Sequence, residues 1–400
     1  MDPGKQFELV TTNASEVIPE AELAAKLRLD RPLRVKHGVD PTAPHVHLGW
    51  SVPLRKLRQF QDLGHIAVLV VGDFTARIGD PSGQDKTRPM LSKEQVDAFA
   101  DTVLGQIKTI LLPDRLEIRP NSEWLEALGT QGVLELASEY TVARTLERDD
   151  FAKRHAEGTP ITVREFLYPL LQAYDSVAVN ADIELGGTDQ HFTFMVARHI
   201  QRAYGQEPQV VMTFPLLEGT DGVQKMSQSL GNYIGITEAP HEMFGKLMRV
   251  PDELMMKFFR LTTDLPVEEI ARIEAQLEAG VLRPEEAKRR LAEEVVRMYH
   301  GSDAAGDART HFDRVFKEHR LPDDIPAVEI PRDCMNDGRV DVPRLLKSLS
   351  FASSTSDARR LIEQGAVHID GDKIDSNDVA VDALAGKVLR VGKLHFARLT

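Results

Sequence analysis

Two histidines and a threonine stand together where a helical segment begins, in the stretch PTAPHVHLGW (41–50). His45 and His47 are two residues apart, so on a helix they would point in different directions and would not share a metal ion. The free N–H groups of a first helical turn, with the positive end of the helix dipole, favour an anion instead. Thr42 and a histidine in that turn could donate hydrogen bonds to phosphate oxygens, although two ordinary surface histidines fit the pattern equally well.

A lysine and two serines lie in a second polar segment, GVQKMSQSLGN (222–232), which is bounded by glycines and follows a strand-like run. Lys225, Ser227 and Ser229 offer a cation and two hydroxyl groups. Such donors suit the transition state of a reaction at phosphorus, where negative charge must be stabilised. Taken alone, however, the segment is more typical of a solvated surface loop.

Three polar residues share one helix face in YPLLQAYD (168–175). Tyr168, Gln172 and Asp175 are spaced i, i+4 and i+7, so a phenol, an amide and a carboxylate would line up along the helix. A solvent-facing polar side is the simpler explanation, but the neighbouring apolar residues are too few for a separate apolar stripe. Further along, ELGGTDQHF (184–192) places a Gly-Gly turn after a strand, and Asp189 in it could accept hydrogen bonds from ribose hydroxyls.

The segments that carry these residues alternate between strand and helix patterns. LRVKHGVDPT (33–42) has the pattern of a strand ending in a turn, WSVPLRKLRQFQDLG (50–64) that of an amphipathic helix, and HIAVLVVGDF (65–74) that of a buried parallel strand. PQVVMTFPLL (208–217) is a later strand. A strand–helix–strand unit of this kind predicts a Rossmann-like, doubly wound parallel α/β domain over residues 1–236, with its site at the carboxyl ends of the strands.

The remainder of the chain changes character. Residues 237–320 have helical patterns only, which predicts an α-helical domain. The stretch LPDDIPAVEIPRD (321–333) is rich in proline and aspartate, as linkers often are. Residues 334–400 predict a small α+β module of two short helices followed by a hairpin, whose turn is the pair Asp370-Gly371.

The overall composition limits the compartment and the kinds of partner. The 400 residues include one cysteine, Cys334, which excludes an intramolecular disulfide framework and a multi-cysteine zinc site and indicates the cytoplasm. The formal net charge of −13 argues against a nucleic-acid contact over the whole surface but allows a basic patch on one domain. No apolar run is long enough to span a bilayer, and MDPGKQFELV lacks the pattern of a signal peptide. We expect a cytoplasmic protein with no membrane partner and no protein-bound metal.

As an ordered set, these motifs resemble the class I aminoacyl-tRNA synthetases, and among them the tyrosyl-tRNA synthetases of the bacterial type. The resemblance covers almost the whole chain. It is carried by Pro-Thr-…-His-x-Leu-Gly (41–49), Tyr-x-x-x-Gln-x-x-Asp (168–175), Gly-Gly-Thr-Asp-Gln (186–190) and Lys-Met-Ser (225–227). GDFTARIGDPSG (72–83) belongs to it too, as does LLKSLSFASSTSDARRLIEQGAVHIDGDKI (345–374), which is similar to the S4-type RNA-binding module.

The resemblance implies an activity and its partners. L-Tyrosine would react with ATP, as its complex with Mg²⁺, to give tyrosyl-adenylate and pyrophosphate, and the tyrosyl group would then pass to the 3′ end of tRNA(Tyr). No protein nucleophile is needed, so catalysis would consist of positioning and charge stabilisation. The family also implies a homodimer formed through an insertion around residues 120–165, an anticodon-side role for residues 237–320 and an S4-like domain over 334–400.

The same resemblance assigns roles to individual residues, and leaves His45 without one. The catalytic residues would be Thr42, His47 and Lys225. The ATP site would consist of Asp40, His47, Gly49, Gly187, Asp189, Lys225, Ser227 and Ser229. The tyrosine site would consist of Gly38, Asp80, Tyr168, Gln172, Asp175 and Gln190, with Asp175 accepting a hydrogen bond from the phenol. RNA would be contacted by Arg344, Lys347, Arg359, Arg360 and Lys373.

Three positions depart from the family pattern. Trp50 stands where a second histidine is usual, Gln228 where a second lysine is usual, and Lys36 where many relatives have a tyrosine. The first two departures remove donors to ATP, so a slower enzyme remains an alternative, as does a relative that makes the adenylate for another acceptor or only binds RNA. A tryptophanyl enzyme is a further alternative, because an indole N–H could also donate to Asp175.

Overall fold

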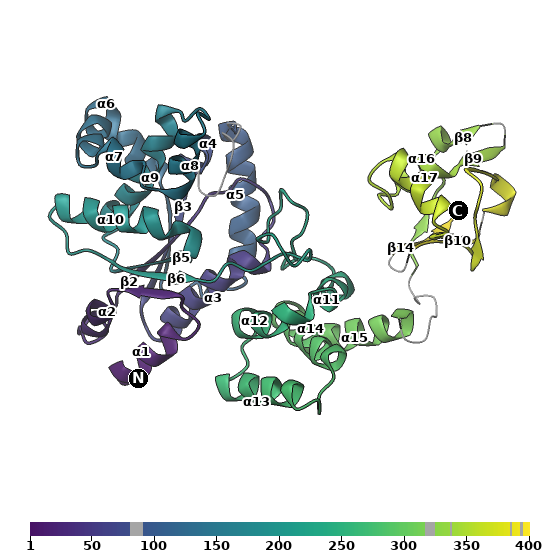
Figure 1. Cartoon of the computed structure of the whole chain (residues 1–400), viewed down its shortest axis with the longest axis horizontal. Coiled ribbons are helices and arrows are strands. Elements are labelled where there is room, and N and C mark those ends of the chain that lie inside the picture. Colours follow the sequence, from purple (N-terminus) through teal and green to yellow (C-terminus); the bar gives the residue numbers. More distant parts are fainter. Residues whose placement is uncertain (81–90, 317–324, 337, 385, 393–394) are drawn as a thin grey trace. The chain divides into compact units, whose positions relative to one another are not determined.

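The computed structural model describes residues 1–80, 91–316, 325–336, 338–384, 386–392 and 395–400 (Figure 1). By its internal contacts the chain forms two compact units, Met1–Gly306 and Asp307–Thr400. Within the described ranges, no helix is long and apolar enough to cross a membrane. Residues 81–83 of the expected motif 72–83 and residues 321–324 of the expected linker lie outside the described residues.

A six-stranded sheet forms the centre of the first unit, with the strand order β1-β6-β5-β2-β3-β4. The strands are β1 (Glu16–Ile18), β2 (Arg34–Val39), β3 (Ile66–Val71), β4 (Leu116–Pro120), β5 (Ile183–Gly187) and β6 (Val210–Phe214). All neighbours pair in parallel except β1, which runs antiparallel to β6. The chain moves outward from β2 through β3 to β4 and then continues with β5 and β6 on the other side of β2. This reversal opens a crevice at the carboxyl ends of β2 and β5, where sheets of this kind bind ligands.

Helices lie on both sides of this sheet, which confirms the predicted doubly wound α/β class (Figure 1). They are α1 (Pro3–Thr11), α2 (Glu20–Lys26), α3 (Leu48–Asp62), α4 (Thr75–Ile78), α5 (Lys93–Ile107), α6 (Ser122–Ser138), α7 (Val142–Thr145), α8 (Asp149–Ala156), α9 (Val163–Ala178) and α10 (His191–Ala203). The start of α9 is fixed by a capping box in which Glu165 accepts a hydrogen bond from the Thr162 N–H at 3.0 Å. This defined start sets which residues of α9 face the carboxyl edge of the sheet.

The helical pattern predicted after residue 236 is confirmed. It comprises α11 (Pro240–Met248), α12 (Asp252–Thr262), α13 (Val267–Glu278), α14 (Pro284–His300) and α15 (Ser302–Phe316). Proline opens α11 and α14, a position where its missing N–H has no helical partner to lose. An ion pair of 2.7 Å between Lys257 on α12 and Glu218 ties this helical segment to the chain that follows β6.

The second unit contains the small α+β module predicted for the end of the chain, together with the C-terminal part of α15. Its elements are β7 (Ala327–Val328), β8 (Met335–Asn336), β9 (Arg339–Asp341), α16 (Val342–Ser348), α17 (Thr355–Glu363), β10 (Val367–Ile369), β11 (Asp372–Lys373), β12 (Asp378–Ala380), β13 (Val388–Val391) and β14 (His395–Leu399). One sheet has the order β11-β10-β13-β14-β7 and the other β12-β9-β8. The predicted hairpin turn is confirmed, since Asp370 and Gly371 have φ of 47° and 96° between β10 and β11.

The linker expected over residues 321–333 is shorter than predicted on its C-terminal side. Ala327–Val328 pairs in parallel with β14, and Ile330 is 3% exposed in the core of the second unit. The two residues of β7 are enough to join the edge of the sheet. They were not predicted as a strand because the surrounding segment is rich in proline and aspartate.

Candidate active site

A cavity of about 890 Å³ lies at the crevice between the carboxyl ends of β2 and β5. Every residue that the sequence predicted for catalysis, for ATP and for tyrosine lines this one cavity: Gly38, Asp40, Thr42, His47, Gly49, Asp80, Tyr168, Gln172, Asp175, Gly187, Asp189, Gln190, Lys225, Ser227 and Ser229. Their convergence is observed, and their individual roles remain predictions.

A hydrogen-bonded cluster around Asp40 marks one end of the cavity. Asp40 follows β2, and its two carboxylate oxygens accept hydrogen bonds from the Tyr168 hydroxyl and from Thr75 Oγ1, each at 2.8 Å. Residue 72, at the end of β3, must be glycine here, because a Cβ would lie 1.8 Å from Asp40 Oδ1. Desolvation raises the pKa of Asp40 to about 7, and the nearby negative charge of Asp80 acts in the same direction.

Asp175 lies one turn further along the same face of α9 that carries Tyr168 and Gln172. It is 4% exposed, and burial raises its pKa to about 7 although the charge of Lys36 works against that rise. Its oxygens accept hydrogen bonds from Trp124 Nε1 at 2.8 Å and Asn121 Nδ2 at 3.3 Å. Since a carboxylate has about four acceptor positions, it keeps capacity for a further donor on a ligand.

The sequence analysis missed Asn121 and Trp124. Both follow β4, whose carboxyl end meets the same sheet edge as those of β2 and β3. The available signal was the polar and aromatic group NSEW (121–124) after the alternating segment LEIRP (116–120), but that segment was not recognised as a strand.

Lys36 lies beneath the cavity and not in its wall. Its ammonium group, 1% exposed, is 2.8 Å from Glu184 Oε1 and donates to Ser176 Oγ at 2.8 Å. The attraction within a buried ion pair offsets the cost of removing both charges from water only if both partners and their hydrogen bonds are present. Lys36 therefore acts on Asp175 through its charge, which lowers the pKa of that carboxyl group.

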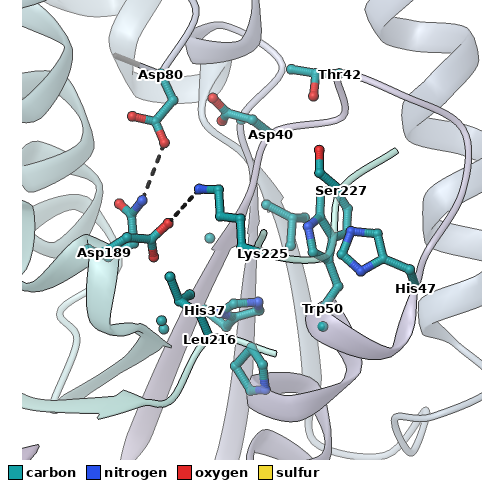
Figure 2. A pocket seen from close by; sticks show the side chains of 18 of the residues that line it. His37, Asp40, Thr42, His47, Trp50, Asp80, Asp189, Leu216, Lys225 and Ser227 are labelled. Carbon is teal, nitrogen blue, oxygen red and sulfur yellow. Dashed lines mark hydrogen bonds and ion pairs between the residues drawn. The ribbon is translucent and has the colours of Figure 1, made fainter. Parts of the chain in front are cut away.

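Amide and carboxylate groups continue the polar end of the cavity. Gln190 Nε2 donates to Asp80 Oδ2 at 3.3 Å, and Gln172 Nε2 lies 3.5 Å from Gln190 Oε1. Figure 2 shows Asp40 and Asp80 facing the same space. Two carboxylates and a phenol around one space suit a primary ammonium group. No group of three or more His, Cys, Asp or Glu in the described ranges has the arrangement of a metal site.

The other end of the cavity joins the turn after β5 to the 222–232 segment. Lys225 Nζ lies 3.0 Å from Asp189 Oδ2, and Figure 2 shows this pair bridging the cavity. The hydroxyl groups of Ser227 and Ser229 are 2.9 Å apart. A cation and hydroxyl donors on a loop opposite a carboxylate can hold a ligand that carries both hydroxyl and phosphate groups.

His47 directly precedes the first residue of α3 and is 4% exposed. Its ring lies 5.7 Å from that of Trp50 and 6.2 Å from that of Tyr233, and its Nδ1 has no hydrogen-bond partner in the described part of the chain. Burial lowers the pKa of His47 to about 4, so near neutral pH its imidazole is uncharged and has one N–H to donate. In this form it can contact a phosphate as a hydrogen-bond donor.

His37 is a second residue that the sequence analysis missed. It lies on β2 in the cavity wall, and its Nδ1 must carry the proton, because it bonds the Leu185 carbonyl at 2.9 Å. Burial lowers its pKa to about 4. The available signal was a histidine in the strand segment RVKHGV (34–39), close to the turn at Asp40.

The chain was compared with known proteins. Residues 28–317 match the family model described as tRNA synthetases class I (W and Y), and residues 342–383 match the S4 domain. A tyrosine–tRNA ligase of Moorella thermoacetica is 52% identical over 99% of this chain and 95% of its own length, and that of Thermotoga maritima is 51% identical over 100% and 98%. The crystal structure of tyrosyl-tRNA synthetase complexed with L-tyrosine from Archaeoglobus fulgidus superposes with a TM-score of 0.63 at 24% identity, covering 77% of this chain and 100% of that one.

The raised pKa of Asp40 predicts a pH-dependent stability in the empty protein. Between the ordinary carboxyl pKa and about 7, folded Asp40 holds a proton that the unfolded chain releases, so stability falls as pH rises through this range. Asp40→Asn removes the ionisable group, while the hydroxyls of Thr75 and Tyr168 can still pair with the amide. The rise in the pKa of Asp40 to about 7 corresponds to a change of at most about 4 kcal/mol in the free energy of unfolding. Contact with water in the cavity reduces this change to about 1–3 kcal/mol.

Thermal unfolding at about pH 5 and about pH 8 measures this effect. The Tm of Asp40→Asn minus the Tm of the wild type should be larger at the higher pH than at the lower one. The exposed Asp62→Asn on α3, which loses only an ion pair with Arg58, should show no such rise. A Tm difference for Asp40→Asn that is the same at both pH values would contradict the buried-carboxylate explanation.

Proposed function

The chain belongs to the class I tRNA synthetase family of the tryptophan and tyrosine type, and on this basis we propose that it is a tyrosine–tRNA ligase. It activates L-tyrosine with ATP and transfers the tyrosyl group to tRNA(Tyr). The structural observation that supports an amino acid with a donor at the end of its side chain is Asp175, a buried carboxylate that has two protein donors and room for a third on a ligand. The full-length relatives at about 50% identity support tyrosine over tryptophan as the substrate.

The amino acid occupies the carboxylate-rich end of the cavity. Its ammonium group is held by Asp80, Tyr168 and Gln172, with Asp40 close behind Tyr168. Its phenol donates to Asp175 at the far end of the same helix face. Gly38 flanks the substrate and Gln190 lies near its carboxylate, because Gln190 is already hydrogen-bonded to Asp80. This arrangement matches both polar ends of tyrosine with a carboxylate.

ATP, as its complex with Mg²⁺, occupies the other end. Asp189 and Gly187 hold the ribose, Gly49 lets the adenine approach α3, and Asp40 lies at the turn between the two substrates. A carboxylate oxygen of tyrosine attacks the α-phosphorus, and the bond from that phosphorus to the pyrophosphate oxygen breaks. Thr42, His47 and Lys225 stabilise the charge on the phosphates, with Ser227 and Ser229 supporting the loop. In the second step a ribose hydroxyl of the tRNA attacks the tyrosyl carbonyl and AMP leaves.

The terminal module binds RNA. Arg344 and Lys347 on α16, Arg359 and Arg360 on α17, and Lys373 on β11 are all exposed. Arg344 also pairs with Asp341, the residue that caps α16, and Arg360 with Asp357 on α17, so part of their charge is already neutralised. Exposed cations on neighbouring elements suit phosphate contacts. The wider division that we propose has the catalytic domain over 1–236, the helical domain over 237–320 and the RNA-binding domain over 334–400, to whose core β7 and Ile330 are added.

The enzyme works as a homodimer in the cytoplasm. Within the expected insertion around residues 120–165, Leu134, Val142 and Val163 are 66%, 62% and 74% exposed. If these side chains gather into one apolar patch, that patch suits a surface covered by a partner. The reducing compartment agrees with a single cysteine that is buried and unpaired.

Tyrosine-dependent exchange of pyrophosphate into ATP, followed by charging of tRNA(Tyr), tests the activity. Asp175→Asn should lower kcat/KM for tyrosine by about 5- to 150-fold, because loss of a hydrogen bond to a buried charged acceptor costs about 1–3 kcal/mol. Asp62→Asn is the matched control and should leave the kinetics unchanged. Absence of exchange in the wild type would refute the proposal, exchange without charging would favour the relative with another acceptor, and equal activity with tryptophan would favour the tryptophanyl alternative.

Sedimentation at several protein concentrations tests the dimer. Val142→Asp places a charge on the apolar surface of the insertion and should raise the dimer dissociation constant by at least about tenfold. Val267→Asp on α13, an exposed valine at 59%, is the control and should leave it unchanged. Equal dissociation constants for both variants would show that the insertion is not the interface.

A further inference from the structure

One side chain fastens the tip of the loop 225–229 to the main chain at the start of α3. Gln228 Nε2 donates to the His45 carbonyl at 2.5 Å, and the His45 N–H donates to Gln228 Oε1 at 3.1 Å. The side-chain amide thus satisfies both backbone groups of one residue, as a neighbouring strand would. The two residues that make this contact are the histidine that had no predicted role and the glutamine that departs from the family pattern.

The tip has little apolar burial to hold it in place. Val223 and Leu230 are 82% and 51% exposed, and Met226 at 5% is buried at the base of the loop, where its N–H donates to the Leu217 carbonyl at 2.8 Å. The position of Gln228 and of the serines beside it therefore depends on hydrogen bonds.

The chain on the far side of the loop is fixed to the same segment. Leu48 donates to the Ile234 carbonyl and Ile236 to the Val46 carbonyl, both at 2.9 Å, and the ring of Tyr233 stacks on that of His45 at 6.0 Å and 17°. Together with the contact of Gln228 with His45, these contacts hold both the tip of the loop and the chain that follows it against the segment before α3.

The residue type at position 228 matters for this contact. A lysine has three donors and no acceptor, so it could bond the His45 carbonyl but would leave the His45 N–H without a partner. Glutamine has both a donor and an acceptor at the end of a side chain of suitable length. Glutamine in place of lysine at position 228 therefore removes a positive charge from the loop and adds a hydrogen-bond acceptor for the His45 N–H.

We propose that Gln228 is a positioning residue that holds the 225–229 loop closed over the nucleotide end of the cavity before ATP binds. Lys225, 3.0 Å from Asp189, is then already inside the cavity when the nucleotide arrives. A loop ordered in advance loses less conformational freedom on binding, so the contact favours ATP and leaves tyrosine binding unaffected. Its kinetic consequence rests on the proposed function, whereas the contact itself does not.

Two measurements on the full-length protein test this role. Amide hydrogen exchange of the empty protein reports on the His45 N–H, and pyrophosphate-exchange kinetics give the KM values for ATP and tyrosine. Gln228→Met has a similar shape and loses both hydrogen bonds, and Gln228→Lys restores the usual family residue. In both variants the His45 amide should exchange about tenfold faster, the effect of one net hydrogen bond. In Gln228→Met the KM for ATP should also rise about tenfold, with the KM for tyrosine within about twofold. Gln228→Glu retains the acceptor and should keep the slow exchange.

Gln276→Met on α13 is the matched control and should change none of these values. Unchanged exchange at His45 in folded Gln228→Met would overturn the proposed contact, and faster exchange with an unchanged KM for ATP would overturn its positioning role. A wild-type protein without pyrophosphate exchange would refute the proposed function alone, since the exchange at His45 still tests the contact.

Discussion

The hydrogen bond between Tyr168 and Asp40 joins α9 to the end of β2 across the cavity, and the rest of the site is arranged around it. A carboxylate can remain in this partly closed space only if donors surround it, and Thr75 supplies the second. The glycine at position 72 makes room for the Asp40 carboxylate, and the capping box at the start of α9 fixes the helix that carries Tyr168. The end of β2, helix α9 and the glycine at position 72 therefore all position the hydrogen bond between Tyr168 and Asp40.

The order of the strands divides the cavity into two ends. The turns after β2 and β5 lie side by side because the strand order reverses between them, so Asp40 and Asp189 face one crevice although they are far apart in the sequence. The carboxylate-rich end suits an ammonium and a phenol, and the end with Lys225 suits phosphates. A reaction that joins an amino-acid carboxylate to a nucleotide phosphate needs these two environments next to each other.

Much of this arrangement could be predicted from the sequence. The apolar runs gave β2, β3 and β6, the spacing of Tyr168, Gln172 and Asp175 gave one face of α9, and the turn residues gave the hairpin at Asp370. The short strands β1 and β4 were missed, because three to five residues carry too weak a pattern, and Asn121 and Trp124 were missed with them. Contacts that depend on three-dimensional packing had no local signal. The buried pair of Lys36 with Glu184 and the contact of Gln228 with His45 join residues far apart in the chain.

The central claim is that Asp175 is held out of water for the phenol of one substrate, and that Asp40 and Asp80 surround the space for the ammonium group of the same substrate. Calorimetry of tyrosine binding to the wild type, in buffers of different ionisation enthalpy near about pH 7, tests it most directly. An ammonium group placed among these carboxylates lowers their pKa from about 7, so binding should release a fraction of a proton to the buffer, and the release should be smaller at about pH 8, where the carboxylates are already largely ionised. Tyrosine binding with no proton release at either pH would contradict the claim.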